Sequence, residues 1–247
     1  MSFLRLIRLF NLVIITLTMI GIADYLLIMN NFQKVIFNPF HYGLLILSTV
    51  LIAAAGNMIN DYFDIKADRV IVKNCNLLAN QDTLYLSEGN TRTYFENCFI
   101  NGTTDFIFGA ATAYFYKCTI ESLVNSYITA ASTPQGQAYG FVFVDCKLTA
   151  KDKSVDKVFL GRPWRPYAQT VFINTDIGSH IIPEGWNVWI DSRFPDKDKT
   201  AYYAEFGSKG SSAKDVSQRV AWSHQLKKED IRKYDRDLVL NGWNPNK

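Results

Sequence analysis

The chain has 247 residues and a formal net charge of +3, and 48% of its residues are hydrophobic. A charge this small and scattered does not indicate a nucleic-acid-binding protein, and four cysteines are too few for a disulfide-dense scaffold. The charged residues are unevenly distributed, because residues 1–59 hold only four of them and the rest of the chain holds the other 45. The sequence therefore predicts an apolar segment followed by a soluble domain, rather than one uniform domain.

Two apolar stretches occupy the N-terminal segment. Residues 10–30 contain a single charged residue, Asp24, and residues 35–60 contain none. Each stretch has about the 20 residues that an α-helix needs to cross a bilayer. Arg5 and Arg8 precede the first stretch, which indicates a cytoplasmic N-terminus. We therefore expect two transmembrane α-helices and association with the membrane, with a cleaved signal peptide as the alternative.

Three carboxylates follow the second apolar stretch, Asp61, Asp64 and Asp68, at spacings of three and four residues. On a helix they would share one face, where they could bind Mg²⁺ and, through it, a diphosphate. A solvated helix end is the alternative. The segment that contains them, residues 60–69, resembles the first aspartate-rich motif of the UbiA-type membrane prenyltransferases. That resemblance covers residues 1–69, about two helices of the family, and the family's second aspartate-rich motif has no counterpart.

A repeated pattern occupies the soluble domain. Short segments of alternating apolar and polar residues end at a cysteine, and a fifth has threonine there; these positions are Cys75, Cys98, Cys118, Cys146 and Thr175. The steps between them are 23, 20, 28 and 29 residues. Alternation of this kind predicts half-buried strands, and its recurrence predicts a parallel β-helix with an internal cysteine ladder. We expect these cysteines to be reduced and structural; a disulfide or a metal site is less favoured, because no Cys-x-x-Cys pair exists.

Two aspartates occupy equivalent places in successive coils. Asp82 lies seven residues after Cys75, and Asp105 lies seven residues after Cys98. Neighbouring strands are about 4.8 Å apart, so the two carboxylates would be close and the pKa of one of them should rise. A charged nucleophile beside a protonated acid is one use of such a pair. The alternative is a pair of turn residues, since aspartate is common in turns.

Three segments resemble the signature motifs of pectin methylesterases, in order and with suitable spacing. They are Gln81-Asp82-Thr83-Leu84-Tyr85, then Gly102-Thr103-Thr104-Asp105-Phe106-Ile107-Phe108-Gly109, then Leu160-Gly161-Arg162-Pro163-Trp164. Shorter segments at residues 127–130, 182–186, 203–206 and 219–222 also match. The resemblance covers residues 70–247 and implies an all-β fold, a right-handed parallel β-helix.

The resemblance also implies an activity, the hydrolysis of the C6 methyl esters of homogalacturonan to pectate and methanol. It assigns Asp105 as the nucleophile and Asp82 as the general acid and base. Gln81 would donate to the oxyanion, and Arg162 would pair with Asp105 and keep it ionised. These roles agree with the chemistry of ester hydrolysis, which needs a nucleophile, an oxyanion donor and an acid for the leaving group.

The substrate implied by the resemblance is methyl-esterified homogalacturonan. Its sugar rings would lie in a groove formed by Trp164, Phe108, Tyr85 and Thr104. Neither a metal ion nor an organic cofactor is expected.

The match departs from the family at its N-terminal side. The family's coils before the Gln-Asp-Thr motif are missing, so the β-helix is expected to be truncated, and a second oxyanion glutamine has no counterpart. A pectin-binding remnant without turnover, or a prenyltransferase fragment, is therefore the alternative function. We expect two domains, residues 1–69 and 70–247, with a helix over residues 223–234 that caps the far end. The family places the catalytic domain outside the cytoplasm, whereas two membrane crossings would return it there, so the topology stays open.

Overall fold

The computed structural model describes residues 16–17, 46–49 and 68–247. The chain divides into two units, residues 1–66 and 67–247. All the strands described below lie in the second unit. Among the described residues, none of the helices has the length and apolar character needed to span a membrane. The two membrane helices expected at residues 10–30 and 35–60 fall almost wholly outside the described ranges and stay predictions.

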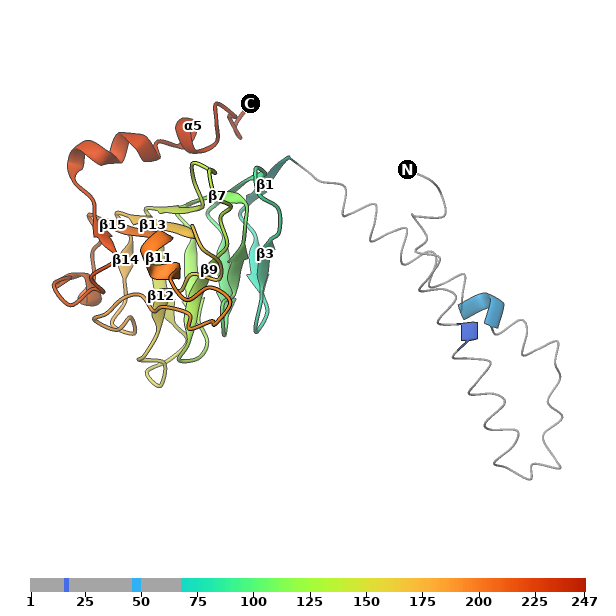
Figure 1. Ribbon diagram of the computed structural model, residues 1–247, viewed down its shortest axis with the longest axis horizontal. Helices are drawn as coiled ribbons and strands as arrows, with labels where there is room; N and C mark the ends of the chain where they lie inside the picture. Colours follow the sequence, from blue (N-terminus) through green and yellow to red (C-terminus); the bar gives the residue numbers. More distant parts are fainter. Residues whose placement is uncertain (1–15, 18–45, 50–67) are drawn as a thin grey trace, which may run out of the picture. The chain divides into compact units, whose positions relative to one another are not determined.

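The second unit is a coil that visits three parallel sheets in turn (Figure 1). The seven-stranded sheet contains β1 (Arg69–Lys73), β4 (Arg92–Glu96), β7 (Thr112–Tyr116), β10 (Phe141–Val144), β13 (Gln169–Ile173), β15 (Tyr202–Phe206) and β16 (His224–Gln225). The five-stranded sheet contains β2 (Asn76–Leu78), β5 (Phe99–Gly102), β8 (Thr119–Ser122), β11 (Lys147–Ala150) and β14 (Asp176–Ile177). The four-stranded sheet contains β3 (Leu84–Leu86), β6 (Ile107–Gly109), β9 (Tyr127–Ala131) and β12 (Phe159–Gly161). This arrangement confirms the expected parallel β-helix.

The turn from the seven-stranded to the five-stranded sheet repeats in every coil. It begins with a residue in the left-handed region, with φ between 50° and 59°, at Asn74, Asn97, Lys117, Asp145, Asn174 and Gly207. The next residue donates its side-chain hydrogen to the carbonyl two positions earlier, over 3.1–3.5 Å, at Cys75, Cys98, Cys118, Cys146 and Thr175. All four cysteines are free. Cys98, Cys118 and Cys146 are buried, as expected of an internal ladder, whereas Cys75 in the first coil is exposed, so the internal position is wrong for that residue. A sixth coil, which begins with β15, was missed because its ladder position is a serine.

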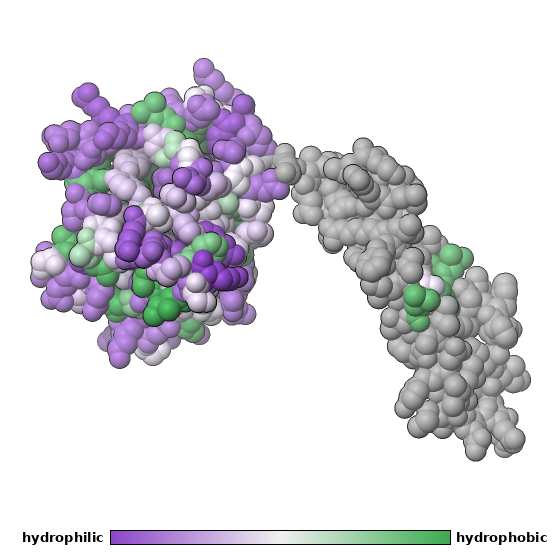
Figure 2. Space-filling model, in the orientation of Figure 1, coloured by the Kyte–Doolittle hydropathy of each residue, from purple (hydrophilic) through white to green (hydrophobic). Residues whose placement is uncertain are grey.

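The core is a stack of side chains that repeats with the coils. Phe95, Phe115, Phe143 and Phe172 form a ladder with ring centroids 4.6, 4.3 and 4.5 Å apart. Apolar residues of the other two sheets, such as Ile100 and Ile107, are fully buried beside it. Figure 2 shows mostly polar residues on the visible face of this unit, as expected for strands that alternate inward and outward.

The C-terminal segment runs along the seven-stranded sheet instead of only capping the coil. It contains η2 (Lys228–Tyr234) and α5 (Arg236–Val239) and lies over the strands in Figure 1. Val239 and Leu240 bury themselves against outward-facing residues such as Tyr94 and Tyr114. The helix expected over residues 223–234 as an end cap is therefore wrong in its place, although β16 does add the last strand at that end. Two shorter elements, α4 (Lys197–Thr200) and η1 (Ser211–Ala213), lie in loops before and after β15.

Candidate active site

Asp82 and Asp105 lie in the same turn of successive coils, just before β3 and β6. Those strands pair in register, with Leu84 opposite Ile107. Both aspartates have left-handed backbone, with φ of 58° and 49°, a conformation that aspartate tolerates better than most residues and that clusters at functional sites. The equivalence expected from their spacing is thus confirmed.

Arg162 holds the Asp105 carboxylate with two hydrogen bonds. Its Nε donates to Oδ1 over 3.0 Å, and its Nη2 donates to Oδ2 over 2.6 Å. Asp105 is only 6% exposed. Arg162 follows β12, and its backbone N–H donates to the carbonyl of Thr129 in β9. A planar fork on a carboxylate fixes the orientation of both groups, so the predicted pairing of these residues is present.

Two aromatic rings enclose the Arg162 guanidinium. Its Cζ lies 3.8 Å from the ring centroid of Tyr127 and 3.9 Å from that of Trp189. Such contacts are favourable cation–π interactions. Lys197 places its Nζ 5.3 Å from the Trp189 ring, is 1% exposed, and has no hydrogen-bond partner for Nζ within the described part of the chain. None of these three residues was assigned a role from sequence, although Tyr127 lies in one matching segment and Trp189 lies just after another.

The pKa of Asp105 is raised above the ordinary value of an aspartate. Burial is the largest cause, and the hydrogen bonds and charge of Arg162 act against it. The negative charge of Asp82 raises the pKa further, which puts the two carboxylates within electrostatic reach of each other. The expected lowering by Arg162 is therefore present as one contribution, but burial outweighs it.

Gln81 and Asp82 are exposed, whereas Asp105, in the equivalent turn of the next coil, is buried. An exposed acid can exchange protons with water, whereas a buried carboxylate is shielded from it. Thr104, expected to contact substrate, is partly buried and shares a 2.8 Å hydrogen bond with Ser126. The structure thus brings together one exposed and one buried aspartate in neighbouring coils.

An aromatic row borders these aspartates on the four-stranded sheet. The rings of Tyr85 and Phe108 are stacked with centroids 4.5 Å apart, and Phe108 meets Trp164 edge-on at 5.9 Å. Tyr85 is 55% exposed. Three of the four side chains expected to form the groove are therefore neighbours, and such a row offers an apolar platform with polar groups beside it.

The aspartate-rich string at residues 60–69 is described only at its end. Asp61 and Asp64 lie outside the described residues. The Asp68 carboxylate accepts two hydrogen bonds from Arg92 Nη2, of 2.8 and 2.7 Å, and this contact lowers its pKa. In the described ranges, no group of three or more His, Cys, Asp or Glu side chains is placed to hold a metal ion.

Sequence comparison matches the family model described as Pectinesterase to residues 49–242. The match begins before residue 70, where the β-helix domain was expected to start. A similar curated protein is the putative pectinesterase 11 of Arabidopsis thaliana, 40% identical over 67% of this chain and 45% of its own length. Another is the probable pectinesterase A of Neosartorya fischeri, 38% identical over 62% of this chain and 45% of its own length. The chain therefore spans about half the length of these relatives or less.

Several solved structures that share this fold are pectin methylesterases. The pectin methylesterase from carrot has a TM-score of 0.63 and 30% identity, over 70% of this chain and 56% of its own. The pectin methylesterase PemA from Erwinia chrysanthemi has a TM-score of 0.61 and 32% identity, over 72% and 58%. A pectin methylesterase mutant bound to a hexasaccharide has a TM-score of 0.59 and 31% identity, over 71% and 58%. The resemblance of residues 1–69 to prenyltransferases stays a prediction.

Proposed function

Because this chain belongs to the pectinesterase family, we propose that it hydrolyses the C6 methyl esters of homogalacturonan to pectate and methanol. One observation carries the proposal: Asp105, buried and held by Arg162 through two hydrogen bonds, lies one coil from the exposed Asp82. The aromatic row of Tyr85, Phe108 and Trp164 beside them suits the apolar faces of sugar rings.

In the first half of the reaction, an Asp105 oxygen attacks the ester carbonyl carbon. The Gln81 side-chain amide donates to the oxyanion that forms. Collapse of the tetrahedral intermediate breaks the bond to the methoxy oxygen, and Asp82, in its acid form, gives that oxygen its proton. Methanol leaves, and the galacturonate carbonyl stays joined to Asp105 as an anhydride.

In the second half, Asp82 is a carboxylate and acts as the base. It takes a proton from water as the water oxygen attacks the acyl carbon. The bond from that carbon to Asp105 breaks, which frees the new galacturonate carboxyl group and restores the Asp105 carboxylate. Asp82 again carries its proton, so every atom and charge is accounted for.

Arg162 prepares Asp105 for both steps. A buried carboxylate prefers its neutral form, which is a poor nucleophile, and Arg162 opposes that preference. The fork also holds the carboxylate in one orientation. The exposed position of Asp82 suits a group that must exchange a proton with water. Since pectin is a polymer of the cell wall, we place the catalytic unit outside the cytoplasm.

The test is methanol release from methyl-esterified pectin by the full chain and by the Asp105→Asn variant. Loss of a nucleophile should lower turnover on the order of 10³-fold or more. The alternative is a pectin-binding remnant without turnover. It would be supported by calorimetric binding of an oligogalacturonide to both folded proteins with methanol from neither, and that outcome would refute the esterase proposal.

A further inference from the structure

The two aromatic residues that enclose the Arg162 guanidinium belong to segments that differ in how regularly they pair with β12. Tyr127 belongs to β9, a regular strand beside β12. Trp189 follows residues 181–187, which lie on the other side of β12 and pair with it only through isolated bridges, such as Gly161 with Trp186. Two hydrogen bonds fasten this irregular rung to β12, from Leu160 N–H to Gly185 O (2.7 Å) and from Asn187 N–H to Gly161 O (3.1 Å).

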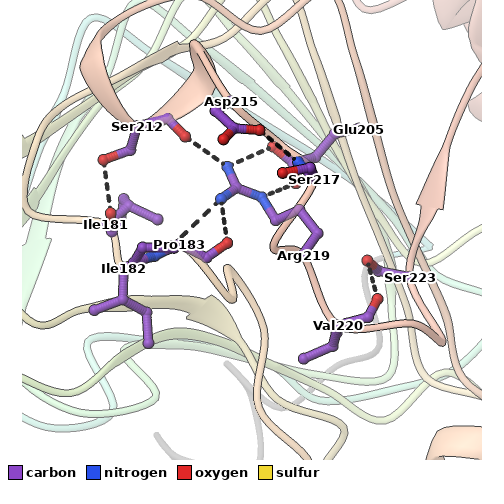
Figure 3. Close-up of polar contacts among 10 residues, drawn as sticks. All are labelled: Ile181, Ile182, Pro183, Glu205, Ser212, Asp215, Ser217, Arg219, Val220 and Ser223. Atoms are coloured by element: carbon purple, nitrogen blue, oxygen red, sulfur yellow. Dashed lines mark hydrogen bonds and ion pairs between the residues drawn. The ribbon is translucent and has the colours of Figure 1, made fainter.

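A buried guanidinium holds the opposite edge of this rung (Figure 3). Arg219 Nη1 donates to the carbonyl of Pro183 over 2.8 Å, and Nη2 donates to the carbonyl of Ser212 over 3.0 Å. Glu205, in β15, accepts from Arg219 Nε over 2.7 Å and from Nη2 over 3.3 Å. The side chains are only 3% and 1% exposed. Glu205 therefore neutralises the Arg219 guanidinium and fixes its orientation, while the remaining Arg219 donors bind backbone carbonyls.

The fit between the Arg219 side chain and the rung is close. Gly185 has φ of +68°, and a Cβ built on it would lie 2.5 Å from Arg219 Cδ. Only glycine satisfies both the backbone conformation and the space. The Glu205–Arg219 pair thus lies against Gly185. The carbonyl of Gly185 accepts a hydrogen bond from Leu160, which is two residues before Arg162.

We infer that the Glu205–Arg219 pair is a positioning device for Arg162. By holding residues 182–185 against β12, it sets the place of Trp189, and Trp189 with Tyr127 keeps the Arg162 fork aimed at Asp105. The inference rests on the proposed function for its catalytic meaning, but its first test does not need turnover. A purely structural role for the pair would affect folding stability and leave the Asp105 carboxyl unchanged.

The test measures the pKa of Asp105 by ¹³C NMR of the full chain, with Asp105→Asn for assignment. In Glu205→Gln the irregular rung should be held less firmly against β12, so Arg162 should pair less well with Asp105. The pKa of Asp105 should then rise by about half a unit or more. Removing the Glu205 charge acts in the opposite direction through space, because the unpaired Arg219 cation would lower the pKa. The sign of the shift therefore separates positioning from electrostatics.

Three further single variants and one double variant guard against misfolding. Arg219→Lys keeps the charge but loses the fork, and it should raise the pKa too. Trp189→Leu leaves the pair intact and should raise the pKa, and Glu205→Gln added to it should have little further effect. Ile100→Val, a buried change in another sheet, is the stability control and should leave the pKa unchanged.

An unchanged or lowered pKa in folded Glu205→Gln or Arg219→Lys overturns the inference, and so does an unchanged pKa in Trp189→Leu. In the methanol assay, Glu205→Gln should lower kcat with little change in KM. If the parent chain releases no methanol, the proposed function fails, while the NMR result still decides the positioning role.

Discussion

Arg162 and Asp105 are 57 residues apart in the chain and form two hydrogen bonds with each other, of 3.0 and 2.6 Å. Arg162 follows β12 and Asp105 precedes β6, with β9 between them in the sheet. The side chain must therefore reach across one rung, and it does so over the ring of Tyr127. A long side chain with a planar end is needed for this span.

Replacing that planar end should impair the reaction even when the charge is kept. Arg162→Lys retains a cation but cannot donate two parallel hydrogen bonds. We expect kcat in the methanol assay to fall on the order of 10²-fold, comparable to the loss of one oxyanion donor. A folded Arg162→Lys with parental kcat would show that the fork has no part in catalysis.

Opposite shifts in the pKa of Asp105 should follow from two neutralising changes. Asp82→Asn removes a negative neighbour and should lower the pKa, whereas Arg162→Gln removes a cation and its hydrogen bonds and should raise it. In the proposed mechanism the Asp105 carboxylate is the nucleophile, so a raised pKa would move the acidic limb of the rate profile to higher pH. NMR titration checks both signs, and shifts in the same direction would contradict this account.

The ring of Tyr127 should matter more than its hydroxyl. Tyr127→Leu removes one of the two rings that enclose the Arg162 guanidinium, a contact worth about 1 kcal/mol. We expect kcat/KM to fall by about threefold to tenfold, while Tyr127→Phe, which keeps the ring, stays near the parent. Equal losses in both variants would instead assign the effect to the hydroxyl.

Burial of His180 should make the protein sensitive to acid. Burial lowers its pKa to about 4, against about 6.5 in an unfolded chain. The unfolded state then binds the extra proton, so stability falls as pH drops from about 6.5 to about 4, by up to about 3 kcal/mol. His180→Gln should lack this loss in urea unfolding followed against pH. The exposed His224→Gln is the control, and identical pH dependence in the parent and His180→Gln would reject the prediction.

The aromatic ladder should carry much of the folding stability. Phe115 lies between Phe95 and Phe143, with centroids 4.6 and 4.3 Å away. Phe115→Ala should cost about 3–5 kcal/mol in the free energy of unfolding. Tyr85→Ala, at the exposed ring of the aromatic row, should cost under about 0.5 kcal/mol and, if the proposed function holds, weaken oligogalacturonide binding instead. Similar costs for the two would argue against the ladder as the main core.

Local sequence was enough to predict the coils and the place of the two aspartates. Each turn needs one residue in the left-handed region, and Asn74, Asn97 and Asp145 supply it with side chains that tolerate this conformation. The cysteine or threonine that follows marks the same point in each coil. Counting seven residues onward therefore placed Asp82 and Asp105 in equivalent turns, because nothing but one short strand and a turn intervenes.

The surroundings of Arg162 depended on the tertiary structure. Trp189 follows an irregular rung, residues 181–187, that has no strand pattern, and Arg219 reaches that rung from beyond the next strand. The C-terminal segment is a similar case. Its apolar residues must be buried against some surface, but the sequence does not determine which sheet they cover. Burial also decided the pKa of Asp105, against the lowering that its partner alone would produce. Sequence by itself determined what repeats within one coil, because those contacts are local; packing between distant segments decided the rest, because loops of varying length set which side chains meet.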